Sequence, residues 1–202
     1  MEEIILASAS PRRRELLMQI GIAHRVFPSL KEEIIQGSSP MEIVQNLARQ
    51  KAEDAALTFR LTDKLVLGAD TVVVWDNQIL GKPLDDEDAF RMLKGLQGNT
   101  HQVYTGVAFV YLKKEASKGV EQLQSHMFYE ETKVQVYPMS DEEIRAYIAT
   151  SEGKDKAGSY GIQGAFAAYI KGIEGDYYNV VGLPVGRVYQ ELKQLFLKWK
   201  QE

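Results

Sequence analysis

Residues Leu65 to Trp75 read Leu-Val-Leu-Gly-Ala-Asp-Thr-Val-Val-Val-Trp, and this run decides how the chain folds. It is apolar on both sides of Asp70 and Thr71, which predicts one buried strand or two abutting strands. Asp76-Asn77-Gln78 then predicts a turn, and Ile79-Leu80 predicts a returning strand. The segment is therefore expected to form a buried strand that ends in a hairpin.

Two strand–helix units precede this run. Ile4–Ala7 predicts a short buried strand, and Ser10-Pro11 supplies an N-cap and a first helical residue for a helix that ends at Gly21. Val26-Phe27 predicts a second strand, after which Ser39-Pro40 begins a long helix with apolar residues at a period of 3.6.

The segments after the run alternate between helical and strand patterns. They predict a helix over Asp86–Leu96, a β-hairpin of 101–112 and 122–137 joined by a loop over 113–124, a helix that follows the Ser140–Glu143 capping box, and an amphipathic helix from Pro184 to about Lys198. This order predicts an α/β fold with a mixed sheet. No shift in composition marks a boundary, so we expect one domain over residues 1–202.

Composition excludes several classes of protein. The 202 residues are 45% hydrophobic and 26% charged, as in a soluble globular protein, and they include no cysteine, which excludes disulfides and thiolate chemistry. The net charge of −4 gives no overall attraction to a nucleic-acid polymer. No apolar run reaches the roughly 18–20 residues of a membrane span, and Met1-Glu2-Glu3 does not begin a signal peptide. We therefore expect a cytoplasmic protein.

Charged residues on otherwise apolar faces are the candidates for function. Arg13 shares one helix face with Leu17 and Ile20, whereas Arg14 does not. Because the first turn of a helix already favours anions, the segment from Ser8 to Arg13 has the chemistry of a phosphate site. Solvated arginines at a helix N-terminus are the alternative.

Lys51 and Asp70 also interrupt apolar patterns. Lys51 lies in one row with Val44, Ala48 and Ala55, and snorkelling to solvent is the alternative to a binding role. A buried carboxylate requires a cation, so Asp70 should pair with a basic side chain or a metal; a structural salt bridge is the alternative to catalysis.

Other known site types find no support. Gly81-Lys82-Pro83 lacks the hydroxyl residue of a P-loop, and the glycines from Gly158 to Gly164 follow a helix rather than a strand, unlike a dinucleotide fingerprint. The three histidines have no zinc-binding spacing, and His101 is expected to be a hydrogen-bonded residue near a strand end.

Several motifs, in this order, resemble those of the Maf family of nucleotide pyrophosphatases over nearly the whole chain. They are 7–17 (ASASPRRRELL), 68–73 (GADTVV), 81–83 (GKP), 101–106 (HQVYTG), 155–164 (DKAGSYGIQG) and 178–185 (YNVVGLPV). The resemblance implies a long, curved mixed sheet with helices that form two lobes around a deep cleft, similar to inosine triphosphate pyrophosphatases. It also implies hydrolysis of a nucleoside triphosphate to a monophosphate and pyrophosphate.

The resemblance also implies roles for individual residues. Phosphate binding falls to Ser8, Arg13, Lys51 and Lys82, catalysis to Asp70, and metal binding to Glu33 together with Asp70. Arg12, Thr71 and Gln163 match the set of the dTTP and UTP group, whereas a sister group that favours 7-methyl-GTP carries Trp, Gln and Glu there. The loop before Glu33 departs from the family pattern, because Leu30 stands where aspartate is common.

The implied reaction is attack of water on the α-phosphorus, assisted by Mg²⁺, Mn²⁺ or Co²⁺, with Asp70 either accepting the proton of water or holding the metal. The family allows a homodimer. A nucleotide-binding regulator with little turnover is the alternative function, and a structural or interaction domain is a third. Release of pyrophosphate distinguishes the first two.

Overall fold

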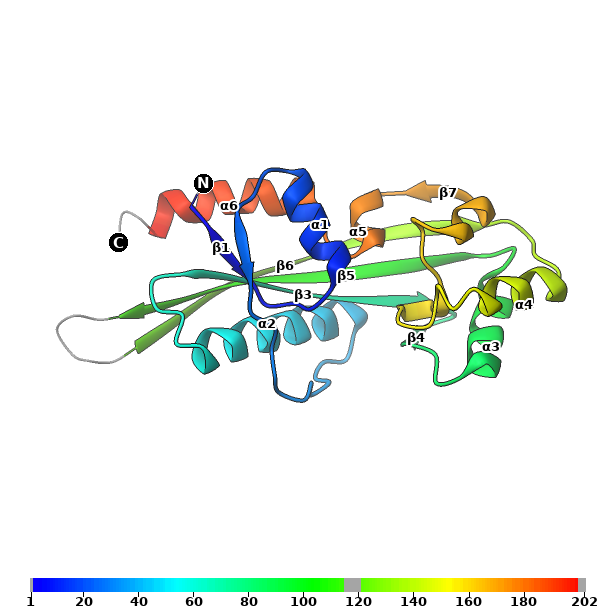
Figure 1. Ribbon diagram of the computed structural model, residues 1–202, viewed down its shortest axis with the longest axis horizontal. Helices are drawn as coiled ribbons and strands as arrows, with labels where there is room; N and C mark the ends of the chain where they lie inside the picture. Colours follow the sequence, from blue (N-terminus) through cyan, green and yellow to red (C-terminus); the bar gives the residue numbers. More distant parts are fainter. Residues whose placement is uncertain (1, 115–120, 200–202) are drawn as a thin grey trace. The chain divides into compact units, whose positions relative to one another are not determined.

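The computed structural model describes residues 2–114 and 121–199. Among these residues, seven strands form one sheet in the order β2-β1-β3-β5-β6-β7, with β4 paired to β3 (Figure 1). Strand β1 runs parallel to β2 and β3, whereas β3–β4 and β6–β7 are antiparallel pairs. The expected mixed α/β fold is thereby confirmed. The strands are β1 (Ile4–Leu6), β2 (His24–Val26), β3 (Leu65–Trp75), β4 (Gln78–Leu80), β5 (Thr100–Lys114), β6 (Glu121–Val136) and β7 (Ile170–Glu174).

Local capping signals set where most helices begin. Ser39 Oγ accepts a hydrogen bond from the Glu42 N–H, and Ser140 and Glu143 form both bonds of the predicted capping box. Ser10 occupies the N-cap position before Pro11, but its side chain makes no capping bond. The helices are α1 (Pro11–Gln19), α2 (Pro40–Thr58), α3 (Asp86–Leu96), α4 (Asp141–Ala149), α5 (Tyr177–Val181) and α6 (Val185–Trp199), with 3₁₀ turns η1 (Ala157–Ser159) and η2 (Ala165–Tyr169).

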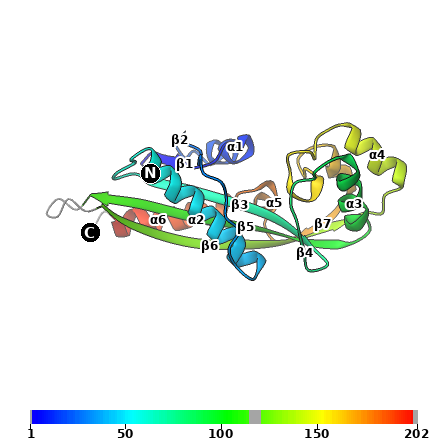
Figure 2. The same ribbon diagram turned by 90° about the horizontal axis from the view of Figure 1, so that it is seen from below.

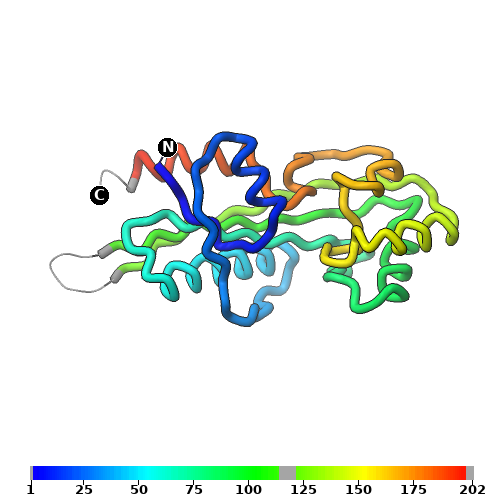
Figure 3. Tube along the Cα trace, viewed as in Figure 1, coloured from blue at the N-terminus to red at the C-terminus, as the bar shows by residue number. Residues whose placement is uncertain are grey.

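The chain forms two compact units, each assembled from separate segments. The first unit combines the residues up to Asp70 with Thr105–Tyr129 and the residues from Gly182 onward; the second combines Thr71–Tyr104 with Glu130–Val181. Figure 3 shows how early, middle and late segments of the sequence contribute to the first unit.

In the first unit, α2 packs directly on one face of the sheet. A Cβ atom at Gly68 of β3 would lie 2.2 Å from the Ala48 carbonyl oxygen, and one at Gly106 of β5 would lie 2.3 Å from that of Val44. Glycine is therefore required at both strand positions for the helix to approach. The resulting core is built mainly from small and β-branched residues: Ile5, Ala7, Ala48, Ala52, Ala55, Ala56, Val66, Ala108 and Val110.

Helix α6 covers the opposite face of this unit (Figure 1). Its Arg187 guanidinium lies 4.4 Å from the centre of the Phe128 ring on β6, and Glu191 Oε2 lies 2.9 Å from His126 Nε2. His126 in turn stacks on Phe109, a residue of β5 whose side chain points away from the Ala108 and Val110 face that α2 covers. A sheet covered by helices on both faces accounts for the nearly continuous apolar run in β3.

In the second unit, α3 and α4 lie side by side (Figure 2). The Arg145 guanidinium lies 4.4 Å from the centre of the Phe90 ring, and one of its nitrogens is 3.0 Å from a Glu87 carboxylate oxygen. Lys94 Nζ is 2.6 Å from an Asp141 carboxylate oxygen. These contacts fix α3, which follows the Lys82 segment in the chain, beside α4, which precedes the segment of Gln163.

The element pattern was largely confirmed, with four differences. Strand β2 begins two residues before the predicted Val26-Phe27 and ends at Val26, one residue before the predicted end. Strands β5 and β6 extend into the segment expected to be a loop, of which residues 115–120 lie outside the described part. Strand β7 and helix α5 were not foreseen. Among the described residues, no helix is both long and apolar enough to cross a membrane.

Candidate active site

The segment predicted to bind phosphate lies where β1 leads into α1 in the first unit. Ser8 is buried, and its Oγ accepts hydrogen bonds from the Ser10 N–H at 3.2 Å and from Arg13 Nη1 at 3.3 Å. Arg13 Nε donates to the Gly182 carbonyl at 2.8 Å. Leu17, one turn further along, is fully buried, whereas Arg14 is exposed, so Arg13 faces inward as its spacing predicts. Arg12 is half-buried in the same turn.

Burial lowers the pKa of the Arg13 guanidinium below its ordinary value, and the Asp70 carboxylate opposes this shift. The charge of Glu33 acts in the same direction as that of Asp70. Arg13 therefore lies within electrostatic reach of both carboxylates expected to serve the reaction.

Lys51, Asp70 and Glu33 form a compact charged cluster in the same unit. Lys51 Nζ lies 2.5 Å from Asp70 Oδ1 and 3.1 Å from Glu33 Oε1. The side chains of Lys51 and Asp70 are only 14% and 13% exposed, whereas that of Glu33 is 49% exposed. The prediction that Asp70 has a basic partner is confirmed, and the partner is the lysine singled out from the apolar row of α2.

Glu33 reaches this cluster because one polar row of α2 holds the loop that carries it. The row has a spacing of four residues, and each member bonds to the loop over 29–38. Gln50 pairs with both the N–H and the carbonyl of Ile34, at 3.0 and 2.7 Å, directly after Glu33 in the chain. The other members are Glu42 with Ser38, Asn46 with Gln36, and Asp54 with Ser29, Leu30 and Lys31. We call this set the α2 ladder.

Asp54 is the most buried member of the α2 ladder. Burial alone would raise its pKa, but hydrogen bonds from the Ser29 hydroxyl, the Leu30 N–H and the Thr58 hydroxyl lower the pKa to about 2. The carboxylate therefore stays ionised and anchors the start of the loop. Sequence reasoning missed this set, although its four-residue spacing of polar side chains was visible along the helix.

Three further predicted residues lie in the second unit. Thr71 is half-buried on β3, and the side chains of Lys82 and Gln163 are exposed. The segment of Lys82 is fixed at its base, because the Gly81 carbonyl accepts a hydrogen bond from the Gly158 N–H at 3.0 Å. Gly158 has a φ of +68°, and a Cβ there would lie 3.0 Å from the Val73 methyl groups, so glycine suits this contact.

His101 has a structural environment, as expected from the sequence. It is fully buried, its Nε2 lies 2.8 Å from the Tyr160 hydroxyl oxygen, and burial lowers its pKa to about 4. The imidazole is therefore neutral near pH 7 and helps to fix the segment that precedes Gln163.

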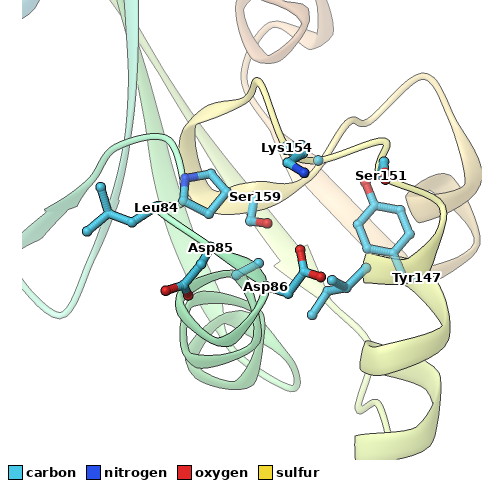
Figure 4. Close-up of a pocket in the computed structure, with 11 residues that line it drawn as sticks. Leu84, Asp85, Asp86, Tyr147, Ser151, Lys154 and Ser159 are labelled. Atoms are coloured by element: carbon cyan, nitrogen blue, oxygen red, sulfur yellow. The ribbon is translucent and has the colours of Figure 1, made fainter.

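A pocket in the second unit lies between the start of α3 and the end of α4 (Figure 4). Asp86, Tyr147, Lys154 and Ser159 contribute to its walls, and Pro83, the neighbour of Lys82 in the chain, does so too. None of the residues expected to bind nucleotide is among the described residues that line this pocket.

Comparison with known proteins gives a consistent result. The family model described as Maf-like protein matches residues 3–195. A dTTP/UTP pyrophosphatase of Agathobacter rectalis is 55% identical over 96% of this chain and 98% of that protein. Proteins of the same name from Lachnoclostridium phytofermentans and Bacillus cereus are 46% and 48% identical over 96% of this chain, and over 95% and 96% of their own lengths.

Among solved structures, the Ham1 protein of Staphylococcus aureus matches 67% of this chain and 72% of its own, with 16% identity and a TM-score of 0.43. The assignment rests on the sequence relatives and on the family model, which spans nearly the whole chain. The chain belongs to the family of Maf-like proteins.

Proposed function

We propose that this protein is an enzyme that hydrolyses dTTP and UTP to the nucleoside monophosphate and pyrophosphate. The observation that carries the proposal is the cluster of Lys51, Asp70 and Glu33 within electrostatic reach of Arg13. A catalytic carboxylate, phosphate-binding cations and a second carboxylate are thus together in one unit. Relatives at 46–55% identity are named dTTP/UTP pyrophosphatases, which supports this substrate class.

Phosphate binding is assigned to Ser8, Arg13, Lys51 and Lys82. Arg13 is held in place by its bonds to Ser8 and to the Gly182 carbonyl, and its remaining donors suit phosphate oxygens. Lys51 offers a single ammonium group that carboxylates already orient. Lys82 is exposed on a short segment whose base is fixed by Gly158, so it can present its charge to a bound triphosphate.

Glu33 and Asp70 are assigned to hold a divalent metal. Both carboxylates lie close to one cationic group, the Lys51 ammonium, so they face a common point in the first unit. Carboxylate and phosphate oxygens are ligands that Mg²⁺ and Mn²⁺ prefer, and Co²⁺ is a third candidate. A metal bound by Glu33 and Asp70 would neutralise phosphate charge and polarise a phosphoryl oxygen.

The reaction needs a proton acceptor and a leaving group. The oxygen of water forms a bond to the α-phosphorus while the bond from that phosphorus to the bridging oxygen breaks, and pyrophosphate leaves with the bridging oxygen. Asp70 serves this step by taking the proton of water or by holding the metal. Arg13, Lys51 and Lys82 stabilise the negative charge that moves onto pyrophosphate.

Recognition of the base is assigned to Gln163 with Arg12 and Thr71. Uracil and thymine present an N3–H donor between two carbonyl acceptors, and a glutamine amide can pair with one carbonyl and the N–H. Cytosine keeps the C2 carbonyl but presents an acceptor at N3 and an amino donor at C4. A site with a fixed amide therefore prefers dTTP and UTP over CTP and tolerates the 5-methyl group. A cytoplasmic location, a homodimer and the lack of a nucleic-acid polymer as partner stay predictions.

A panel of canonical and 5-modified triphosphates, assayed for pyrophosphate with Mg²⁺, Mn²⁺ or Co²⁺, tests the proposal. We expect the highest kcat/KM with dTTP and UTP. Nucleotide binding without turnover would favour the regulator instead, and a purine triphosphate or 7-methyl-GTP as best substrate would contradict the pyrimidine assignment.

A further inference from the structure

A pair of side chains in the second unit, the buried Tyr147 and the half-buried Glu152, holds both ends of the turn that carries Gln163. Glu152 Oε2 accepts a hydrogen bond from the Ala165 N–H at 2.8 Å, and Glu152 Oε1 accepts one from the Tyr147 hydroxyl at 3.0 Å. The Tyr147 oxygen itself accepts from the Gly161 N–H at 3.1 Å. Gln163 lies midway between these two anchored amides.

The two glycines that flank Gln163 pack against the same carboxylate. A Cβ atom at Gly164 would lie 2.2 Å from the Glu152 carboxylate, and one at Gly161 would lie 3.2 Å from Glu152 Oε1. A side chain at Gly164 would therefore displace the carboxylate. The turn therefore both bonds to the Glu152 carboxylate and packs against it.

The pair is itself rigidly placed. Tyr147 lies in the last turn of α4, is only 4% exposed, and packs its ring 5.0 Å from that of Phe166; its place beside the pocket is visible in Figure 4. Burial raises the pKa of the Tyr147 hydroxyl, so the hydroxyl stays protonated and donates a hydrogen bond to Glu152. The Glu152 N–H donates to Thr150 Oγ1 at 3.2 Å, and Lys156 Nζ donates to the Glu152 carbonyl.

We propose that Glu152 is a positioning residue that sets base selectivity by fixing the turn of Gln163, an inference that rests on the proposed function. An amide can serve uracil or cytosine by turning over, so it discriminates only if its backbone is held. The two Glu152 carboxylate oxygens accept from the Ala165 N–H, at one end of the turn, and from the Tyr147 hydroxyl, whose oxygen holds the Gly161 N–H at the other end. Glu152 thereby acts on selectivity through Gln163 and takes no part in the phosphate chemistry.

The test compares kcat/KM for UTP and CTP in wild type and Glu152→Gln. The glutamine is the same size, but only one of its two end atoms can accept, so it cannot accept from the Ala165 N–H and the Tyr147 hydroxyl together, and one of these two hydrogen bonds is lost. We expect the UTP/CTP ratio to fall about tenfold, the effect of one lost hydrogen bond. The charge-matched control is Glu174→Gln, an exposed residue of β7 paired with Lys133, which should leave the ratio unchanged.

Two further measurements separate positioning from a general structural effect. In a Gln163→Ala background, Glu152→Gln should change the UTP/CTP ratio no further, because its effect passes through Gln163. In the ligand-free protein, the amides of Gly161 and Ala165 should exchange hydrogen faster in Glu152→Gln than in wild type. Tyr147→Phe removes the same link with the ring retained and serves if Glu152→Gln does not fold.

An unchanged ratio, an equal fall in kcat/KM for both nucleotides, or an undiminished effect without Gln163 would each overturn the inference. A wild-type enzyme without preference for UTP over CTP would contradict the proposed preference for uracil over cytosine, and with it the role of Glu152 in selectivity. In that case faster amide exchange in Glu152→Gln would still establish the anchoring of the turn, so the two failures remain distinguishable.

Discussion

Single charged residues on apolar faces carry most of the candidate site. Arg13, Lys51 and Asp70 each interrupt a hydrophobic pattern, and the structure pairs Lys51 with Asp70 and bonds Arg13 to Ser8. These residues could be predicted because burying an unpaired charge is costly, so an inward charge signals a partner. Glu152 and Tyr147 could not, because their roles depend on the path of a backbone turn that no periodicity reveals.

Asp70→Asn should abolish turnover while nucleotide still binds. The amide can neither accept a proton nor hold a metal as a carboxylate does, so kcat should fall on the order of 10²-fold or more. Steady-state kinetics with UTP and a binding titration measure the two effects. Asp63→Asn, at an exposed carboxylate of the same unit, is the control and should keep wild-type kcat. Near wild-type kcat in Asp70→Asn would make Asp70 a structural partner only.

Arg13→Ala should lower kcat/KM for the triphosphate substrate and leave the fold intact. The change removes charge-assisted hydrogen bonds worth roughly 1.5–3 kcal/mol, which corresponds to about a 10- to 100-fold fall in kcat/KM. Arg14→Ala is a matched control, since the neighbouring side chain is exposed. Equal kinetics of both variants, with normal circular dichroism, would move the phosphate site away from α1.

At the scale of elements, local signals identified most helices and the turn between β3 and β4, but they missed strand β7 and helix α5. Ser39 and the pair Ser140 and Glu143 cap their helices as the sequence indicates, and Asp76-Asn77 forms the tight turn between β3 and β4 with both φ angles positive. Strand β7 was missed because Gly172 interrupts its short pattern, and its pairing with β6 supplies the stability that local propensity does not.

Helix α2 does more than pack on the sheet, because the α2 ladder holds the loop of Glu33. Asp54→Asn should lower the stability of the protein at pH 7 by about 1–3 kcal/mol, since several hydrogen bonds to a charged acceptor are weakened. Glu53→Gln, at the adjacent half-buried position, should have a much smaller effect. Urea unfolding of both variants measures the difference.

Asp54 should also make the stability of the protein depend on pH. Its pKa is lowered from 3.8 to about 2 in the folded protein, so its contribution is complete above pH 3.8 and is lost as the pH falls from 3.8 through about 2. The stability gap between wild type and Asp54→Asn should therefore be constant from pH 7 to about pH 5 and shrink below pH 4. A gap that stays constant to pH 3 would contradict the assigned pKa.

At the scale of the whole molecule, the sequence predicted the fold class but not the division of the chain into two compact units. Three of the four boundaries of the two compact units fall inside β3, β5 and β6, and the fourth falls directly after α5, so no change in composition marks them. Likewise, the bond from Arg13 to the Gly182 carbonyl joins residues 169 positions apart, a contact that no local pattern reports. The resemblance of the motifs to a known family, and not the periodicity of the sequence, indicated that residues so far apart in the chain serve one site.

Hydrolysis of UTP in H₂¹⁸O tests the central claim most directly, because it reports which phosphorus water attacks. Attack at the α-phosphorus predicts that the label enters UMP and that pyrophosphate stays unlabelled, with no UDP formed. Mass spectrometry of the products after a single turnover makes the measurement. Label in pyrophosphate with unlabelled UMP, or formation of UDP and labelled phosphate, would contradict the account.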